Sequence, residues 1–191
     1  MVKNYIFAFT GNIHYEEDHH VRSNASKFGT LHEERNAYKP ITSQYTVEIW
    51  GKAAIGLYLW KHVLSGELQN MHNGFIQQGY LTVDDITFVY RSGPGIIQTT
   101  VPNDVQYLVL VLNGRSEEKI ESSRLWLDFL PLYPDLKKLA VVLLGNERCD
   151  NNWILPYVHS RGGRINVVFL VYDSPLIDNL EFYQWPLGVA V

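Results

Sequence analysis

Three long apolar runs in the second half of the chain constrain its fold more than any other feature. The runs are VQYLVLVL (105–112), LAVVLLG (139–145) and NVVFLVY (166–172), and stretches with helical character separate them. Strands that are apolar at almost every position are typical of parallel sheets buried on both faces. Because strands and helices alternate, right-handed crossovers are favoured. The sequence therefore predicts an α/β, Rossmann-like domain whose mostly parallel sheet carries helices on both faces.

Two further strands and a helix are predicted ahead of these runs. TVEIW (46–50) and TFVY (87–90) have strand character, and residues 53–66 between them have the pattern of a helix. Three apolar residues at helical spacing would share one face of this helix: Leu57, Trp60 and Leu64. Because the helix is apolar nearly all round, it is expected to be well covered.

Two more helical segments are predicted between the long runs. Ser116 is expected to cap a helix in whose first turn Glu117 and Glu118 complement the helix dipole. Pro131 is expected to end that helix. A shorter helical piece is predicted from about residue 150 to residue 163.

Residues 1–44 differ from the rest of the chain, because charged and polar residues dominate them from 14 to 36. We interpret them as a flexible leader or stem that precedes a folded lobe at 45–191. An N-glycosylation pattern places a candidate glycan on Asn24, which matters only in the secretory pathway. The stretch HYEEDHH (14–20) has metal-ligating residue types, but no rigid scaffold is expected there and no metal site is predicted.

The overall composition excludes several classes of protein. With 46% hydrophobic and 19% charged residues, the chain is typical of a folded globular protein. A net charge of −4 gives no general reason to expect nucleic acid or an anionic membrane surface as a partner. Cys149 is the only cysteine, so no disulfide can form within the chain. The early apolar run YIFAF (5–9) is too short for a signal peptide or a membrane span.

Polar segments follow four of the predicted strands at the points where those strands end. In open α/β sheets, ligands bind beyond the carboxyl ends of the strands. The segments are Gly51-Lys52, Asn113-Gly114-Arg115, Gly145-Asn146-Glu147-Arg148 and Asp173-Ser174. We therefore expect a ligand site at one edge of the sheet, with these side chains around it.

Several of these residues have both a functional and a structural interpretation. Lys52 at the start of a helix opposes the helix dipole, which favours a bound phosphate, yet it can equally pair with a carboxylate or point into solvent. Arg115 and Arg148 are candidate anion ligands, although surface arginines are common. Asp173 suits a base, a ribose ligand or a turn cap. Asp84-Asp85 is better explained by a solvated turn than by a metal site.

Five stretches of the chain resemble one family, in the family's order and at similar spacing. They are IWGKAAIGLYLW (49–60), LVLVLNGR (108–115), LAVVLLGNERCDNNW (139–153), and FLVYDSP with FYQWPLGVA (169–175, 182–190). These stretches resemble the ribitol-5-phosphate xylosyltransferases that act in building the O-mannosyl glycan of α-dystroglycan. The resemblance covers roughly residues 45–190.

The resemblance implies a Golgi membrane enzyme with a lumenal domain that transfers xylose from UDP-xylose to ribitol 5-phosphate with inversion. It implies a two-lobed, GT-B-like architecture, of which this chain is the first, acceptor-side lobe. In the family, FYQWPLGVA continues into a second half about as long again. We therefore expect a truncated and inactive portion of the enzyme: a shortened isoform, an incomplete gene model or a fragment. The missing half is expected to leave an apolar patch near Phe182, Trp185 and Leu187, which an interface between the lobes would otherwise bury.

The same resemblance supplies the expected partners and cofactors. UDP-xylose is the expected donor, and a phosphorylated glycan on α-dystroglycan is the expected acceptor. Other glycan-assembly enzymes are candidate partners, and nucleic acid is not expected as a partner. No permanently bound cofactor is implied, and a metal requirement is left open. A non-catalytic module that binds a phosphorylated glycan or an enzyme partner is the alternative function.

The strand-end residues receive roles on this basis. Asp173 and Glu147 are the candidate catalytic bases. Five residues are candidate substrate ligands: Lys52, Asn113, Arg115, Asn146 and Arg148. Trp50 and Trp185 have the right chemistry to stack on a sugar, but a place in the core is the better expectation for both.

Overall fold

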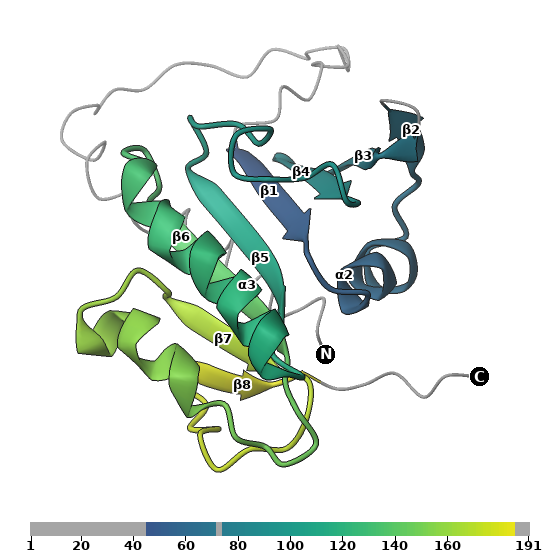
Figure 1. Ribbon diagram of the computed structural model, residues 1–191. Helices are drawn as coiled ribbons and strands as arrows, with labels where there is room; N and C mark the ends of the chain where they lie inside the picture. Colours follow the sequence, from purple (N-terminus) through teal and green to yellow (C-terminus); the bar gives the residue numbers. More distant parts are fainter. Residues whose placement is uncertain (1–44, 72–73, 186–191) are drawn as a thin grey trace, which may run out of the picture. The chain divides into compact units, whose positions relative to one another are not determined.

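The computed structural model describes residues 45–71 and 74–185 of the chain (Figure 1). The strands are β1 (Tyr45–Gly51), β2 (Gln69–Met71), β3 (Ile76–Val83), β4 (Ile86–Ser92), β5 (Tyr107–Asn113), β6 (Lys138–Leu144), β7 (Val167–Leu170) and β8 (Phe182–Gln184). The helices are α2 (Ile55–Tyr58), which continues into the π-helical turn η1 (Leu59–Val63), α3 (Glu117–Phe129), and the 3₁₀ segments η3 (Leu130–Leu132), η4 (Asn152–Tyr157) and η5 (His159–Arg161).

The strands of the described residues form a single eight-stranded sheet in the order β2-β3-β4-β1-β5-β6-β7-β8. Strands β2, β3 and β4 pair antiparallel at one end, and the six strands from β4 to β8 pair in parallel. The predicted α/β class with a mostly parallel sheet is confirmed. From β1 the chain adds β4 on one side, and it then crosses to the other side of β1 to form β5. The direction in which strands are added therefore reverses at β1 and β5, and the carboxyl ends of these two strands form the topological switch point.

Helix α3 packs on one face of this sheet, in front of β5 and β6 in Figure 1. Trp50 on β1 contacts Trp126 of α3 and Tyr133, with ring centroids 5.7 and 5.6 Å apart. Side chains alternate along a strand, so Tyr90 on β4, opposite Ile49 in register, points to the other face. There it stacks on Trp60 of η1 with centroids 5.3 Å apart. Helices thus cover both faces, as predicted.

The helix predicted over 53–66 is present, but one of its expected core residues is exposed. Trp60 and Leu64 are buried, whereas Leu57 is 36% exposed. The second half of the helix is π-helical, with the Leu64 amide bonded to the carbonyl of Leu59, so α-helical spacing does not hold along it. The prediction for Leu57 was therefore wrong.

The remaining helical segments follow the sequence closely. Ser116 lies at the N-cap of α3 with extended backbone, but its side chain makes no capping hydrogen bond. Helix α3 ends at Phe129, and Pro131 lies in the 3₁₀ turn η3 that follows. The piece predicted over 150–163 consists of η4 and η5. Asp84 and Asp85 form the tight turn between β3 and β4, which confirms the solvated-turn interpretation.

Three strands were not predicted from the sequence: β2, β3 and β8. Strand β3 reads IQQGYLTV, with too many polar residues and a glycine to stand out as a buried strand. Its antiparallel place near the edge of the sheet explains this composition, because only part of it is covered. Strand β8 is only three residues long.

The prediction of an exposed apolar patch around Phe182, Trp185 and Leu187 was wrong for the two of these residues that the structure describes. Phe182 is 4% exposed and Trp185 is 1% exposed, so both belong to the interior. Leu187 lies outside the described residues, as do the predicted leader, Asn24 and the histidine-rich stretch at 14–20. No helix within the described ranges is long and apolar enough to cross a membrane.

Candidate functional site at the carboxyl edge of the sheet

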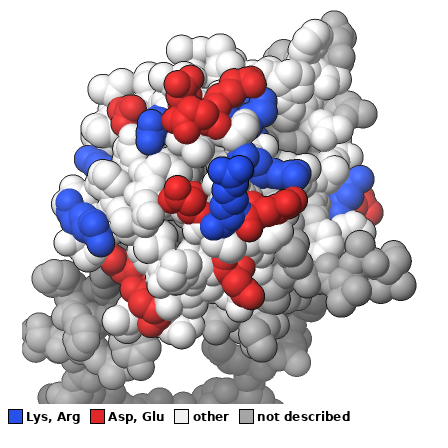
Figure 2. All heavy atoms as spheres, turned by 60° about the horizontal axis from the view of Figure 1, so that its bottom comes forward, with Lys and Arg blue, Asp and Glu red and all other residues white. Residues whose placement is uncertain are grey.

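Four of the predicted polar segments lie along one edge of the sheet. Strands β1, β5, β6 and β7 are consecutive neighbours and run parallel, so their carboxyl ends point the same way. Figure 2 turns the molecule so that this edge comes forward. Basic and acidic side chains are interspersed across the face it shows, without a large area of a single sign.

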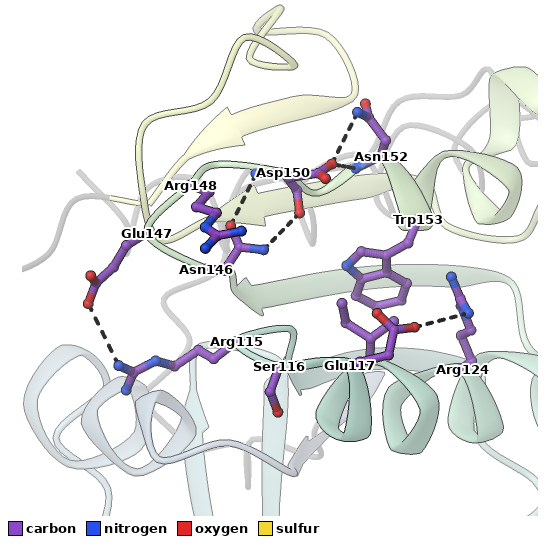
Figure 3. Close-up of a pocket in the computed structure, with 11 residues that line it drawn as sticks. Arg115, Ser116, Glu117, Arg124, Asn146, Glu147, Arg148, Asp150, Asn152 and Trp153 are labelled. Atoms are coloured by element: carbon purple, nitrogen blue, oxygen red, sulfur yellow. Dashed lines mark hydrogen bonds and ion pairs between the residues drawn. The ribbon is translucent and has the colours of Figure 1, made fainter.

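A cavity of about 800 Å³ opens at this edge between the ends of β5 and β6 (Figure 3), and we name it the Arg115 cleft. It is lined by Arg115, Ser116, Glu117, Ile120, Arg124, Asn146, Glu147, Arg148, Asp150, Asn152 and Trp153. Four of the predicted site residues are among them: Arg115, Asn146, Glu147 and Arg148. The structure therefore brings this part of the predicted set together.

One wall of the Arg115 cleft is the first half of α3. Glu117, Ile120 and Arg124 are spaced by three and four residues, so they form one stripe along the helix. Because the Ser116 side chain does not cap the helix, it leaves the amides of the first turn without that partner. The Arg115 amide is bonded to Asn113 Oδ1 at 3.1 Å, which fixes the turn from β5 into α3.

The opposite wall is the loop after β6, which is held by its own hydrogen bonds. Asn146 Nδ2 donates to the carbonyl of Asp150 at 3.2 Å, and the Asp150 amide donates to Asn146 Oδ1 at 3.2 Å. Cys149 has a left-handed backbone with φ of 58°, and its amide donates to the Asn146 carbonyl at 3.0 Å. Asn146 thus organises the loop, which is a structural role that the sequence did not indicate.

Trp153 closes the base of the cleft. Its partly buried ring packs against the core, and the Arg124 guanidinium lies 5.9 Å from its centroid. The indole nitrogen of Trp153 is buried and has no hydrogen-bond partner among the described residues. This nitrogen lies close to Gly114, because a Cβ atom added to Gly114 would be 3.4 Å from it. The amide of Asn151, which is 1% exposed, also has no partner for either polar atom. Unpaired buried polar groups are uncommon in folded proteins, and both lie in the segment that forms the cleft.

The charged groups of the cleft are only weakly paired with each other. Arg115 Nη2 lies 3.8 Å from Glu147 Oε1, and these side chains are 55% and 79% exposed. Arg124 lies 3.9 Å from Glu117 and is likewise exposed. Exposed pairs at such distances contribute little, roughly 0–1 kcal/mol, so a ligand can replace them at small cost. The guanidinium and amide groups around the Trp153 ring can hydrogen-bond a ligand that carries hydroxyl groups and an anionic group, such as a sugar phosphate.

A second cavity, of about 480 Å³, lies at the switch point beside this cleft, and we name it the Lys52 pocket. Two predicted ligands, Lys52 and Asn113, line it and do not line the Arg115 cleft. Lys52 Nζ donates to the carbonyl of Ile96 at 2.6 Å and lies 5.3 Å from the Trp126 ring centroid. Within residues 45–71 and 74–185, Lys52 has no carboxylate partner, and its side chain is only partly exposed, so neither structural alternative matches this arrangement.

The other predicted residues lie apart from both cavities. Asp173 follows β7, lines neither cavity and accepts a hydrogen bond from the Gln184 side chain. Trp50 is fully buried and Trp185 is 1% exposed, which confirms a core role for both. Within residues 45–71 and 74–185, no group of three or more His, Cys, Asp or Glu side chains is placed to hold a metal ion.

Sequence reasoning missed several residues of the Arg115 cleft, above all Arg124 and Trp153. Arg124 lies seven residues after Glu117, which places both on the same face of a helix that starts beside the end of β5. This spacing could have indicated that Arg124 lines the cleft. Trp153 had no such signal, because the 3₁₀ turn that positions it has no marked periodicity.

A family model and a set of curated relatives agree in what this chain is similar to. A family model described as the RXYLT1 N-terminal domain matches residues 47–186. The chain is 47% identical over 150 residues to ribitol-5-phosphate xylosyltransferase 1 of Danio rerio, a match that covers 76% of this chain and 35% of that protein. It is 44% identical over 149 residues to the protein of the same name from Homo sapiens, covering 76% and 34%.

The corresponding Mus musculus protein is 42% identical over 151 residues, covering 77% of this chain and 34% of that protein. The chain thus spans about a third of the length of these relatives. Both cavities at the carboxyl edge lie within the matched region.

Proposed function

The chain belongs to the RXYLT1 N-terminal domain family, and from this premise we propose that it is the acceptor-binding lobe of a ribitol-5-phosphate xylosyltransferase. The observation that supports this role most directly is the Arg115 cleft, a cavity of about 800 Å³ at the carboxyl edge of an α/β sheet that has room for a sugar phosphate. The proposed reaction transfers xylose from UDP-xylose to ribitol 5-phosphate in the O-mannosyl glycan of α-dystroglycan, in the Golgi lumen.

In this proposal the cleft holds the ribitol 5-phosphate end of the acceptor. The Trp153 ring provides an apolar surface for the carbon chain, and the amides of Asn146 and Asn152 can hydrogen-bond its hydroxyl groups. The guanidinium of Arg148 reaches back over its loop toward the cleft (Figure 3), where it can meet the phosphate. The other lobe of a GT-B-like enzyme would bring the nucleotide sugar.

The proposed chemistry is a single displacement with inversion. A base removes the proton of the attacking ribitol hydroxyl while its oxygen forms a bond to the anomeric carbon of xylose, and the bond from that carbon to the UDP oxygen breaks. Glu147 is the base we favour, because it lies on the rim of the cleft. Asp173 does not line the Arg115 cleft, so it could act as the base only for an acceptor bound outside this cleft.

Two assays on the same protein test this proposal. Isothermal titration calorimetry measures binding of ribitol 5-phosphate, and a transfer assay supplies UDP-xylose with a ribitol-phosphate acceptor. We expect binding that weakens at least about tenfold in Arg148→Met, because a charge-assisted hydrogen bond is lost, and remains unchanged in the exposed control Arg161→Met.

The outcomes separate the candidate functions. Binding without turnover supports an acceptor lobe that needs a further part for catalysis, whereas turnover by this chain alone would contradict that division of roles. Absence of binding, or equal binding in both variants, would refute the assignment of the Arg115 cleft. A non-catalytic module for a phosphorylated glycan would bind in the same way but gain no activity when the rest of the enzyme is supplied.

A further inference from the structure

The Lys52 pocket differs from the Arg115 cleft in its charge. Twelve residues line it: Gly51, Lys52, Ala53, Ala54, Leu57, Gln77, Tyr90, Ser92, Gly93, Pro94, Asn113 and Lys119. Two of them are lysines and none is acidic, whereas three acidic residues line the Arg115 cleft. The pocket is therefore the positively charged cavity of this edge.

Lys52 is the unusual member of this set. Among the described residues it has no carboxylate partner, and its partners are the Ile96 carbonyl at 2.6 Å and the Trp126 ring. Burial lowers the pKa of the Lys52 ammonium below its usual value. A half-buried charge is costly without a counterion, and a bound anion would reduce that cost.

The neutral groups of the pocket can complete an anion site. The hydroxyl of Tyr90 lies beside Gly51, where an added Cβ would approach it to 2.6 Å, so a side chain on Gly51 would crowd this part of the pocket. Ser92 and the amide groups of Gln77 and Asn113 also line the cavity. These hydroxyl and amide groups line the cavity together with two lysines, and a phosphate accepts hydrogen bonds from all of these groups. A bound anion would compete with two contacts: Ser92 Oγ donates to Gln77 Oε1 at 3.5 Å, and Lys119 Nζ lies 3.4 Å from Glu118 Oε1.

The position of the pocket gives an independent reason to expect a ligand. Strands β4, β1 and β5 lie side by side and end at the switch point of the sheet (Figure 1). The last residues of these strands, Ser92, Gly51 and Asn113, line the pocket. Ligands of open α/β sheets gather at this point because the connections from the two neighbouring strands diverge there and leave a crevice. The crevice is made mainly by residues that the Arg115 cleft does not use.

We propose that the Lys52 pocket is a distinct phosphate-binding subsite, in which Lys52 and Lys119 hold the anion and Tyr90 and Ser92 donate to it. The site takes a phosphate monoester or diester, and it does not depend on the proposed transfer of xylose. Phosphate on the acceptor and the diphosphate of a nucleotide share this chemistry.

Binding of inorganic phosphate, measured by calorimetry and by the shift of the melting temperature, tests the subsite. We expect Lys52→Met to weaken binding about tenfold or more, because it removes a partly desolvated charged donor. Lys119→Met, at an exposed side chain, is expected to weaken it severalfold and serves where Lys52→Met does not fold. Lys137→Met is the matched control, because Lys137 lies over Tyr107 near the amino end of β5.

Competition then identifies the source of the phosphate. Displacement of inorganic phosphate by ribitol 5-phosphate but not UDP supports an acceptor subsite, and the reverse order supports a nucleotide subsite. Either result upholds the site. Equal phosphate affinity in the Lys52, Lys119 and Lys137 variants, or no phosphate binding by the unmodified chain, would overturn it. Loss of ribitol 5-phosphate binding in Arg148→Met with phosphate binding retained would show that the two cavities act separately.

Discussion

Replacement of Arg91 by methionine tests a buried polar network that joins β1 and β4. Glu48, which is 6% exposed, accepts hydrogen bonds from Arg91 Nε at 2.8 Å, Arg91 Nη2 at 3.1 Å and Trp50 Nε1 at 3.0 Å. Burial alone would lower the pKa of Arg91, but the hydrogen bonds and charge of Glu48 outweigh it and raise that pKa. Trp50 in turn packs on Trp126, over which Lys52 lies.

The cost of Arg91→Met follows from this burial. Breaking a fully buried ion pair costs about 3–5 kcal/mol, because the remaining charge is left unpaired. The Arg91 side chain is 20% exposed, so water can partly replace it, and we expect about 2–4 kcal/mol. For a chain of this size that lowers the melting temperature by roughly 4–16 °C.

Urea unfolding followed by tryptophan fluorescence measures this change in the free energy of unfolding. Adding Glu48→Gln to Arg91→Met removes the unpaired charge but keeps an acceptor for the Trp50 indole. We therefore expect the double variant to regain at least half of the loss. The Glu48→Gln single variant completes the cycle and gives the coupling energy between the two positions. A single Arg91→Met variant within about 0.5 kcal/mol of the unmodified chain would refute the reasoning.

Three further predictions concern separate parts of the molecule. Gly79→Ala should destabilise the fold by about 1–3 kcal/mol in the same urea assay, because its Cβ would lie 2.3 Å from the Glu67 carbonyl oxygen and 2.6 Å from the Trp60 ring. Asp178→Ala should lower the melting temperature at pH 7, since Asp178 Oδ1 accepts three backbone amides at 2.8–3.0 Å. Desolvation is the largest single influence and raises the Asp178 pKa, but the backbone hydrogen bonds together outweigh it and lower that pKa. The stabilisation by Asp178 is therefore present above the ordinary aspartate pKa and lost as pH falls through the lowered one, and a difference between the two proteins that grows on acidification would contradict this. Trp153→Ala should weaken ribitol 5-phosphate binding about tenfold in calorimetry, while Trp153→Phe should retain most of it, and equal loss in both would exclude an aromatic surface as the reason.

The sequence predicted the parallel core of the sheet because its strands are buried on both faces, which leaves an unbroken apolar signal in β5, β6 and β7. It did not predict β2, β3 and β8, because short or half-covered strands carry no such signal. The exposure of Leu57 was missed for a related reason, since periodicity arguments assume an α-helix and the chain forms a π-helical turn.

The candidate site was predicted in outline and not in detail. Lys52, Arg115, Glu147 and Asp173 were predicted to lie at one edge of the sheet because each follows the end of a strand. The four strands are parallel neighbours, so their carboxyl ends do lie at one edge. It did not indicate that this edge divides into two cavities, or that Asp173 lies outside both. Those details depend on how α3 and the loop after β6 pack, which strand patterns do not encode.

The most direct test of the acceptor-binding assignment is nuclear magnetic resonance of the tryptophan indole groups during titration with ribitol 5-phosphate. The chain has five tryptophans, and single Trp→Phe variants assign their five indole signals. Binding in the Arg115 cleft is predicted to shift the Trp153 signal, whose indole nitrogen lacks a protein partner, while Trp185 stays unchanged in the core. A titration that leaves Trp153 unmoved, or shifts Trp185 instead, would contradict the assignment.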